Sequence, residues 1–177
     1  MDKSPEHIQT INEYLTAIVK DDKYSEIVVH EAVEGLGNMN DDNVLSLLKE
    51  FEGSERECSA MVTETCQLAH DNIIWHKTTE SGKSEELDMT KLKVKTNDPA
   101  PPFNYLKEPE KYANVELMKN MLLDNENHSL FNRYRAMFTL REIGTEEACH
   151  AICQTLKAEH HQTCCPLLKH EVSFVLA

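Results

Sequence analysis

The chain has 177 residues, of which 40% are hydrophobic and 28% are charged, a balance typical of a folded globular protein rather than of a disordered chain. The formal net charge of −13 argues against a nucleic-acid partner, because binding to phosphates requires clustered lysine and arginine side chains. A protein this acidic is better suited to a cationic substrate or to a basic protein surface.

No stretch of about 18 consecutive apolar residues occurs, so the sequence predicts no membrane span. The first residues, MDKSPEHIQT, lack the apolar core of a secretion signal. We therefore expect a cytoplasmic protein whose six cysteines are reduced thiols. Four of them fall within helical patterns, where cysteine acts as a small buried hydrophobe: Cys58, Cys66, Cys149 and Cys153.

The first part of the chain predicts a series of short amphipathic helices. Ser4 and Pro5 suit the cap and the first position of a helix at 5–20, in which apolar residues recur every three or four positions. Similar patterns begin at Ser25, at 41 and at Ser54, and Glu57 follows Ser54 at the spacing of a capping box. The scarcity of glycine, with 5 in the chain, also favours helix.

The pattern changes between Lys77 and Phe103, where large apolar residues are few. Pro99, Pro101 and Pro102 restrict helix formation and favour an extended path. We therefore predict a linker at 79–107, largely exposed and disordered at 79–95. It would join an N-terminal half at 1–78 to a C-terminal half at 108–177.

Helical patterns resume near Pro109 and continue through segments at 128–144, from Thr145 and from Pro166. These segments also repeat earlier ones. When 28–48 is laid over 132–152, Ala32 falls on Ala136, Leu36 falls on Leu140, and the turn at 40–41 falls on the turn at 144–145. A repeated helical hairpin of roughly thirty residues is the signature of an α-solenoid. The predicted fold is therefore all-α, a solenoid of helical hairpins in two halves.

Two His-Glu dipeptides stand at the same position of this repeat, His30-Glu31 and His170-Glu171. Neighbouring residues on a helix diverge by about 100° around its axis, so we expect the two members of a pair to face different neighbouring helices. A metal site would then need such pairs from several helices. Imidazole and carboxylate together suit iron, manganese or zinc. A third repeat has Tyr134-Arg135 at this position, for which we expect a structural role.

Other metal motifs fit the sequence less well. A zinc protease helix would place histidine four positions after His30 or His170, where Glu34 and Phe174 stand instead. A ferritin-like bundle needs two Glu-x-x-His motifs, and the sequence has one, from Glu147 to His150, on a helix that we expect to be exposed. The stretch HHQTCC at 160–165 has no zinc-module spacing.

Several stretches resemble the deoxyhypusine hydroxylases, a family of HEAT-repeat di-iron monooxygenases. They are VVHEAVEGLGNMND at 28–41, ETCQLA at 64–69, DPAPPF at 98–103, RYRAMFTLR at 133–141 and LLKHEVSFVLA at 167–177, and they occur in the order found in the family. The combination of DPAPP, RYRAMF and KHEV is specific, and the resemblance covers nearly the whole chain.

This resemblance implies two halves of stacked HEAT-like hairpins, each with two His-Glu pairs, and a centre of two Fe(II) ions held by the four pairs. It implies that dioxygen hydroxylates the deoxyhypusine side chain on the hypusine-bearing translation factor to give hypusine. His30, Glu31, His170 and Glu171 would be iron ligands, matching the second pair of the first half and the first pair of the second. The other two pairs have no counterpart, so we expect the middle of the family's protein with both ends absent.

Three interpretations follow from the sequence. The chain is a deoxyhypusine hydroxylase represented by an incomplete sequence, or a truncated HEAT-repeat protein that binds the translation factor without chemistry. The third is a dimer that assembles four pairs from two copies. It is the least favoured, because non-equivalent helices would have to replace the missing ones.

Overall fold

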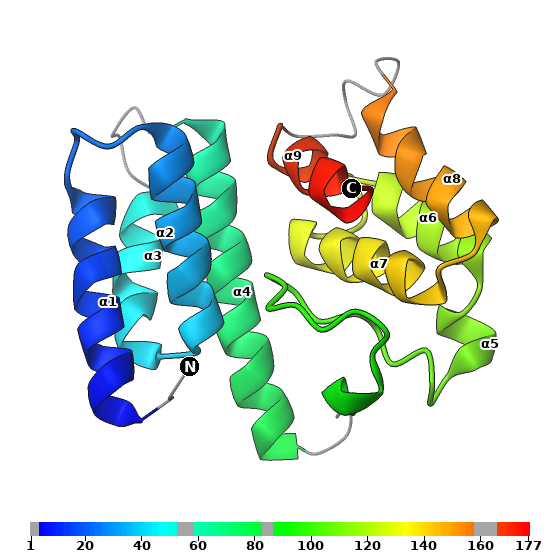
Figure 1. The fold of residues 1–177 in the computed structure, drawn as a ribbon, viewed down its shortest axis with the longest axis horizontal. Helices are drawn as coiled ribbons and strands as arrows, with labels where there is room; N and C mark the ends of the chain where they lie inside the picture. The colour runs from blue at the N-terminus through cyan, green and yellow to red at the C-terminus, as the bar shows by residue number, and fades with distance from the viewer. Residues whose placement is uncertain (1–3, 53–58, 83–86, 158–165) are drawn as a thin grey trace. The chain divides into compact units, whose positions relative to one another are not determined.

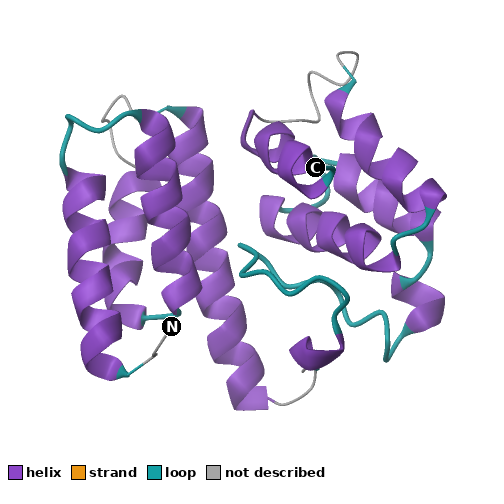
Figure 2. Cartoon of the chain, viewed as in Figure 1, coloured by secondary structure: helices purple, strands orange, loops and turns teal. Residues whose placement is uncertain are grey.

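The computed structural model describes residues 4–52, 59–82, 87–157 and 166–177. Every regular element within those ranges is a helix, as Figure 2 shows, which confirms the all-α prediction. The chain divides into two compact units, Met1–Thr78 and Thr79–Ala177, which are described separately. The predicted division into two halves and a linker stays a prediction. None of the described helices combines the length and the apolar character that a membrane crossing requires.

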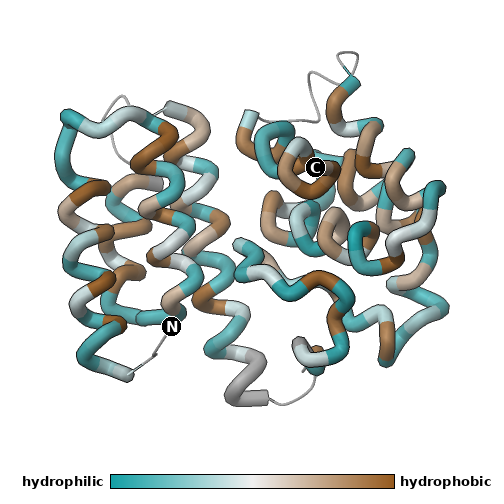
Figure 3. The backbone as a smooth tube through the Cα atoms, viewed as in Figure 1, coloured by the Kyte–Doolittle hydropathy of each residue, from teal (hydrophilic) through white to brown (hydrophobic). Residues whose placement is uncertain are grey.

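The first unit is built from adjacent helices that share one apolar core (Figure 1). They are α1 (Pro5–Lys20), α2 (Glu26–Met39), the 3₁₀ turn η1 (Asp42–Val44), α3 (Leu45–Glu52) and the long helix α4 (Ala60–Gly82). Apolar and polar residues alternate along these helices in Figure 3, as expected when one face of each helix is buried. Buried residues from α2, α3 and α4 form most of the core, including Val33, Leu36, Leu48, Cys66 and Ile73.

The predicted start of the first helix is confirmed in position, but without the expected capping hydrogen bond. Pro5 is the first residue of α1, but the Ser4 side chain makes no capping hydrogen bond, and its Oγ lies 3.1 Å from His7 Nδ1 instead. The predicted capping box at Ser54 and Glu57 lies outside the described residues, as do Cys58 and the stretch at 160–165.

The turns at Asn40 and Gly144 have the same conformation, as the predicted repeat requires. Asn40, with φ 54°, and Gly144, with φ 66°, are the left-handed residues that end α2 and α7. The next residue then caps the following helix, since the side chains of Asp41 and Thr145 each accept a backbone N–H bond. The overlaid alanine and leucine positions are buried in both units, as the predicted overlay of the two hairpins requires.

The second unit is organised around α7 (Leu130–Ile143), which packs against α6 (Val115–Leu123), α8 (Glu146–Cys153) and α9 (Pro166–Val175). Shorter elements complete it: η2 (Met89–Lys91), α5 (Pro109–Tyr112) and η3 (Gln154–Leu156). α7 is buried on nearly all sides, and its buried residues include polar ones, among them Arg133, Arg135, Thr139 and Glu142.

Arg135, Thr139 and Glu142, together with Arg141, hold the non-helical segment at 93–103 against α7. The Glu142 carboxylate accepts the backbone N–H groups of Lys93, at 2.7 Å, and Val94, at 3.1 Å. Further along, Thr139 Oγ1 accepts the N–H of Phe103 at 2.9 Å. Arg135 Nε donates to the Pro101 carbonyl at 3.1 Å. Arg141 forms a bidentate ion pair with Asp98.

The prediction of a largely exposed linker is therefore wrong for part of its length. Residues 99–103 are buried, as are Leu87 and Leu92, and α4 extends to Gly82, into the region expected to be disordered. The physical reason is that a buried segment without helix or strand partners must find hydrogen-bond donors and acceptors elsewhere, and the polar side chains of α7 supply them. Proline removes N–H donors at three of these positions, which lowers that demand.

The described cysteines are free thiols, as predicted, but their burial differs. Cys66 is buried and Cys153 is partly buried, whereas Cys149 is exposed, so the expectation of a buried position is wrong for Cys149. Burial raises the pKa of the Cys153 thiol above its usual value, and the neighbouring Cys149 adds to the shift.

Candidate metal site

His30 is the most constrained of the predicted ligands. It lies on α2, its residue is 1% exposed, and its Nδ1 is 2.8 Å from Thr65 Oγ1 on α4. The Thr65 hydroxyl donates its own proton to the Met61 carbonyl at 2.7 Å. Thr65 must therefore accept from His30, so Nδ1 carries the proton and Nε2 carries the lone pair. A metal-binding histidine is commonly oriented in this way, by a hydrogen bond from its other ring nitrogen.

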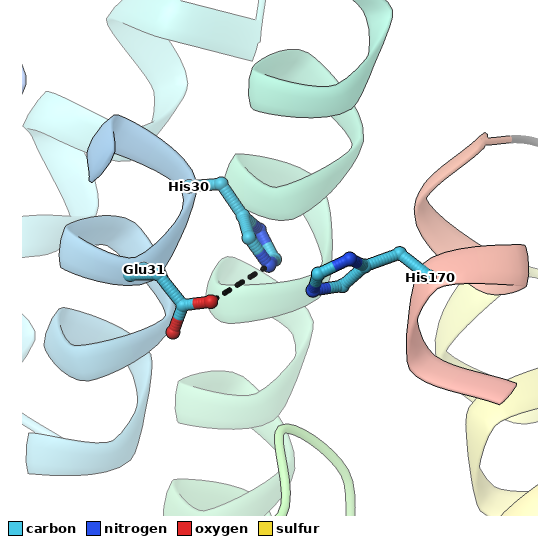
Figure 4. Close-up of side chains that lie close together, drawn as sticks. All are labelled: His30, Glu31 and His170. Atoms are coloured by element: carbon cyan, nitrogen blue, oxygen red, sulfur yellow. Dashed lines mark ion pairs between the residues drawn. The ribbon is translucent and has the colours of Figure 1, made fainter. Parts of the chain in front are cut away.

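Two carboxylates of the same helix surround His30 Nε2. Figure 4 shows the Glu31 carboxylate turned toward the His30 ring, with Oε1 3.9 Å from Nε2. Glu34 Oε2 lies 4.0 Å from the same nitrogen. The Glu31 side chain is 60% exposed and that of Glu34 is 21% exposed, so both reach the buried imidazole from the solvent side.

These distances are compatible with a shared metal ion. First-row metals bind nitrogen and oxygen at about 2.0–2.2 Å, so two ligand atoms of one ion are at most about 4.4 Å apart. The Nε2 lone pair and the two carboxylates are all acceptors. Such a group of atoms binds either a proton, on Nε2, or a metal cation. The donor set fits iron, manganese or zinc.

We expected His30 and Glu31 to face different neighbours. Their side chains do leave the helix in different directions, but their terminal polar groups lie close together. The pair does diverge, since the histidine is buried against α4 while the glutamate is mostly exposed. However, the flexible glutamate side chain brings its carboxylate back to the imidazole. Sequence reasoning also missed Glu34, which the spacing of four residues from His30 on one helix could have indicated.

The second predicted pair, His170-Glu171, lies on α9, where both residues are half-buried. Figure 4 shows the His170 side chain extending from this helix. Its ring packs edge-on against Phe174, with the ring centroids 4.9 Å apart. The buried face of α9 carries Leu167, Leu168 and Val172, so His170 lies at its border. Val172 is buried at the frame position of Ala32, as the repeat predicts.

Tyr134-Arg135, at the same repeat position in α7, is structural, as expected. Tyr134 is completely buried and meets Phe138 edge-on, with the centroids 6.1 Å apart. The Arg135 guanidinium stacks over the Phe103 ring at 4.1 Å. The Glu-x-x-His motif from Glu147 to His150 is exposed on α8, also as expected.

Comparison with known proteins agrees with this architecture. The family model for the PBS lyase HEAT-like repeat matches residues 133–158. The solved structure of human deoxyhypusine hydroxylase in complex with glycerol superposes with a TM-score of 0.74 at 32% sequence identity, covering 98% of this chain and 51% of that one. The predicted solenoid of HEAT-like hairpins is thereby confirmed.

Curated relatives carry the same name. The deoxyhypusine hydroxylase of Kluyveromyces lactis is 38% identical over 161 residues, which are 91% of this chain and 45% of the relative. The deoxyhypusine hydroxylase of Danio rerio is 37% identical over 163 residues, 92% of this chain and 47% of the relative. This chain spans about half the length of the curated relatives it matches, and by sequence and fold it belongs to the deoxyhypusine hydroxylase family.

Proposed function

We propose that this chain provides iron ligands to a deoxyhypusine hydroxylase, through His30, Glu31, His170 and Glu171. The reaction is the hydroxylation of the deoxyhypusine side chain on the hypusine-bearing translation factor, which gives hypusine. The observation that carries the proposal is His30, since a buried imidazole with its proton fixed on Nδ1 presents the Nε2 lone pair beside two carboxylates. A pair of bound Fe(II) ions would supply the activation of dioxygen.

The protein's own residues prepare the ligands. Thr65 holds the His30 ring in one tautomer and one orientation, so binding of the metal requires no rearrangement of that side chain. The exposed Glu31 carboxylate is free to rotate toward the imidazole or toward solvent. We propose that His170 and Glu171 have the same role on α9, because they occupy the same position of the repeat.

The charge of the protein supports the proposed substrate. With a net charge of −13, the chain attracts a cationic side chain on a basic protein loop, and this attraction raises the rate of encounter more than the affinity. We place the activity in the cytoplasm, where reduced thiols and a translation factor are both found.

The direct test is the iron content of the purified chain after anaerobic loading with Fe(II). His30→Ala and His170→Ala should each lower the bound iron, and His150→Ala is the matched control, because this histidine is exposed on α8. Unchanged iron in the His30 or His170 variant would contradict the ligand assignment for that residue.

Activity separates the proposal from the interaction-protein alternative. Oxygen-dependent formation of hypusine on the translation factor supports an enzyme. Binding of the translation factor with neither iron nor product supports a HEAT-repeat scaffold. Sedimentation with and without iron tests the remaining hypothesis, because a dimer that shares the centre should dissociate when the iron is removed.

A further inference from the structure

A cavity at the other end of α2 is separate from the candidate metal site. Its volume is about 710 Å³, and it is lined by one face of α1 and by the turn that leads from α2 into η1. Asn40, in that turn, is ten residues after His30, which corresponds to about 15 Å along a helix. The cavity lies entirely within the first unit.

Two carboxylates stand among the amide and hydroxyl side chains that line this cavity, and each accepts a bond from a neighbouring amide, Glu13 from Gln9 and Asp41 from Asn12 and Asn43. Glu13 and Asp41 contribute carboxylates, and among the described residues that line the cavity none is lysine, arginine or histidine. Ile8, Met39 and Val44 contribute an apolar part of the wall. The cavity therefore combines negative charge with apolar surface, in an environment without a basic side chain of its own.

Asn12 provides a second and independent observation. It is 7% exposed, it lines the cavity, and its Nδ2 donates to Asp41 Oδ2 at 2.7 Å. This bond fixes the orientation of the amide, because the opposite orientation would place two oxygens together. The Asn12 Oδ1 atom is then left without a hydrogen-bond partner among the described residues. A buried carbonyl oxygen without a hydrogen-bond donor is unfavourable, and a ligand in the cavity could supply that donor.

We propose that this cavity binds a primary alkylammonium group. Such a group has three N–H donors for the Asn12 oxygen and the two carboxylates, and its alkyl chain fits the apolar wall. A small alcohol would lack the positive charge, and a quaternary ammonium ion would lack the N–H donors. The group can belong to a free amine or to a lysine side chain of another protein.

The test is an NMR titration of the full chain with n-butylammonium chloride, followed at the side-chain amide of Asn12. We expect saturable shifts at Asn12 and at the residues around it, and weaker or no binding of n-butanol and butyltrimethylammonium. A short lysine-containing peptide forms the second arm. Binding of the free amine alone identifies a small-molecule site, whereas tighter binding of the peptide identifies a protein lysine as the source.

Glu13→Gln removes one carboxylate from an exposed position of α1, and should weaken n-butylammonium binding about tenfold. Glu6→Gln is the matched control, because Glu6 lies exposed on the same helix and does not line the cavity. The proposal would be overturned by equal binding of n-butanol, by equal effects of the two substitutions, or by Ca²⁺ producing the saturable shifts in place of the amine. Asn12→Leu, with its fold checked by circular dichroism, should remove binding as well.

Discussion

Replacement of Thr65 by valine tests the link between the fold and the candidate metal site. Valine preserves the shape of the side chain but removes the hydroxyl that accepts the His30 N–H at 2.8 Å. Loss of a hydrogen bond from a buried imidazole destabilises a protein by about 1–3 kcal/mol. For a chain of this length, we expect the Tm to fall by about 2–4 °C for each kcal/mol lost.

The same substitution should also act on the tautomer and on the metal. Without Thr65 the proton is no longer fixed on Nδ1, which ¹⁵N chemical shifts of the His30 ring report directly. Loss of such a supporting hydrogen bond typically lowers metal affinity by about 10- to 100-fold, so Fe(II) titration should show a weaker site. Thr65→Ser keeps the hydroxyl and should recover most of both properties.

Thr63→Val is the matched control, because Thr63 lies on the same helix and is half-buried. The reasoning would be refuted if Thr65→Val and Thr63→Val lowered the unfolding free energy equally, with the His30 proton still on Nδ1. Denaturant unfolding, followed by circular dichroism, gives the two free energies under identical conditions.

Two further predictions concern packing and pH. Gly37→Ala should lower the unfolding free energy by about 1–3 kcal/mol, because the added Cβ would lie 2.8 Å from the Cβ of Ala69. Gly35→Ala is the control: its Cβ would meet only the flexible end of a leucine side chain, so the unfolding free energy should change by less than about 1 kcal/mol. Urea unfolding measures both changes. Burial, with the Glu142 carboxylate, raises the pKa of Tyr105 above its usual 10.0, so the neutral phenol stabilises the fold below pH 10 and this stabilisation is lost as the pH rises through the raised pKa. Glu142→Gln should move the ultraviolet titration of Tyr105 back toward its ordinary pKa, and an unchanged titration would show that the carboxylate has no influence.

The helical repeat could be predicted because its determinants are local. A left-handed residue followed by a capping side chain, at Asn40-Asp41 and again at Gly144-Thr145, is visible in the sequence at fixed spacing. The buried positions between them follow the helical period, so the overlay of the two hairpins predicted which residues enter the core.

The segment at 93–103 could not be predicted in the same way. Its prolines correctly indicated that no helix forms at 99–103, but the absence of a helix does not say whether a segment is exposed. The burial depends on Arg135, Thr139 and Glu142, which are more than thirty residues away in the sequence and which satisfy its backbone groups one after another. Their polar character made α7 look less buried than it is.

The sequence by itself determined the helices, the repeat and the family, and it singled out His30, Glu31, His170 and Glu171, because spacing and residue type are properties of the chain. Only the tertiary structure decided the state of His30. The residue that fixes its proton, Thr65, lies on another helix 35 positions away, and Glu34 joins the site through a side-chain conformation. A tautomer depends on which acceptor the fold brings within hydrogen-bonding distance, and that information is absent from local sequence patterns.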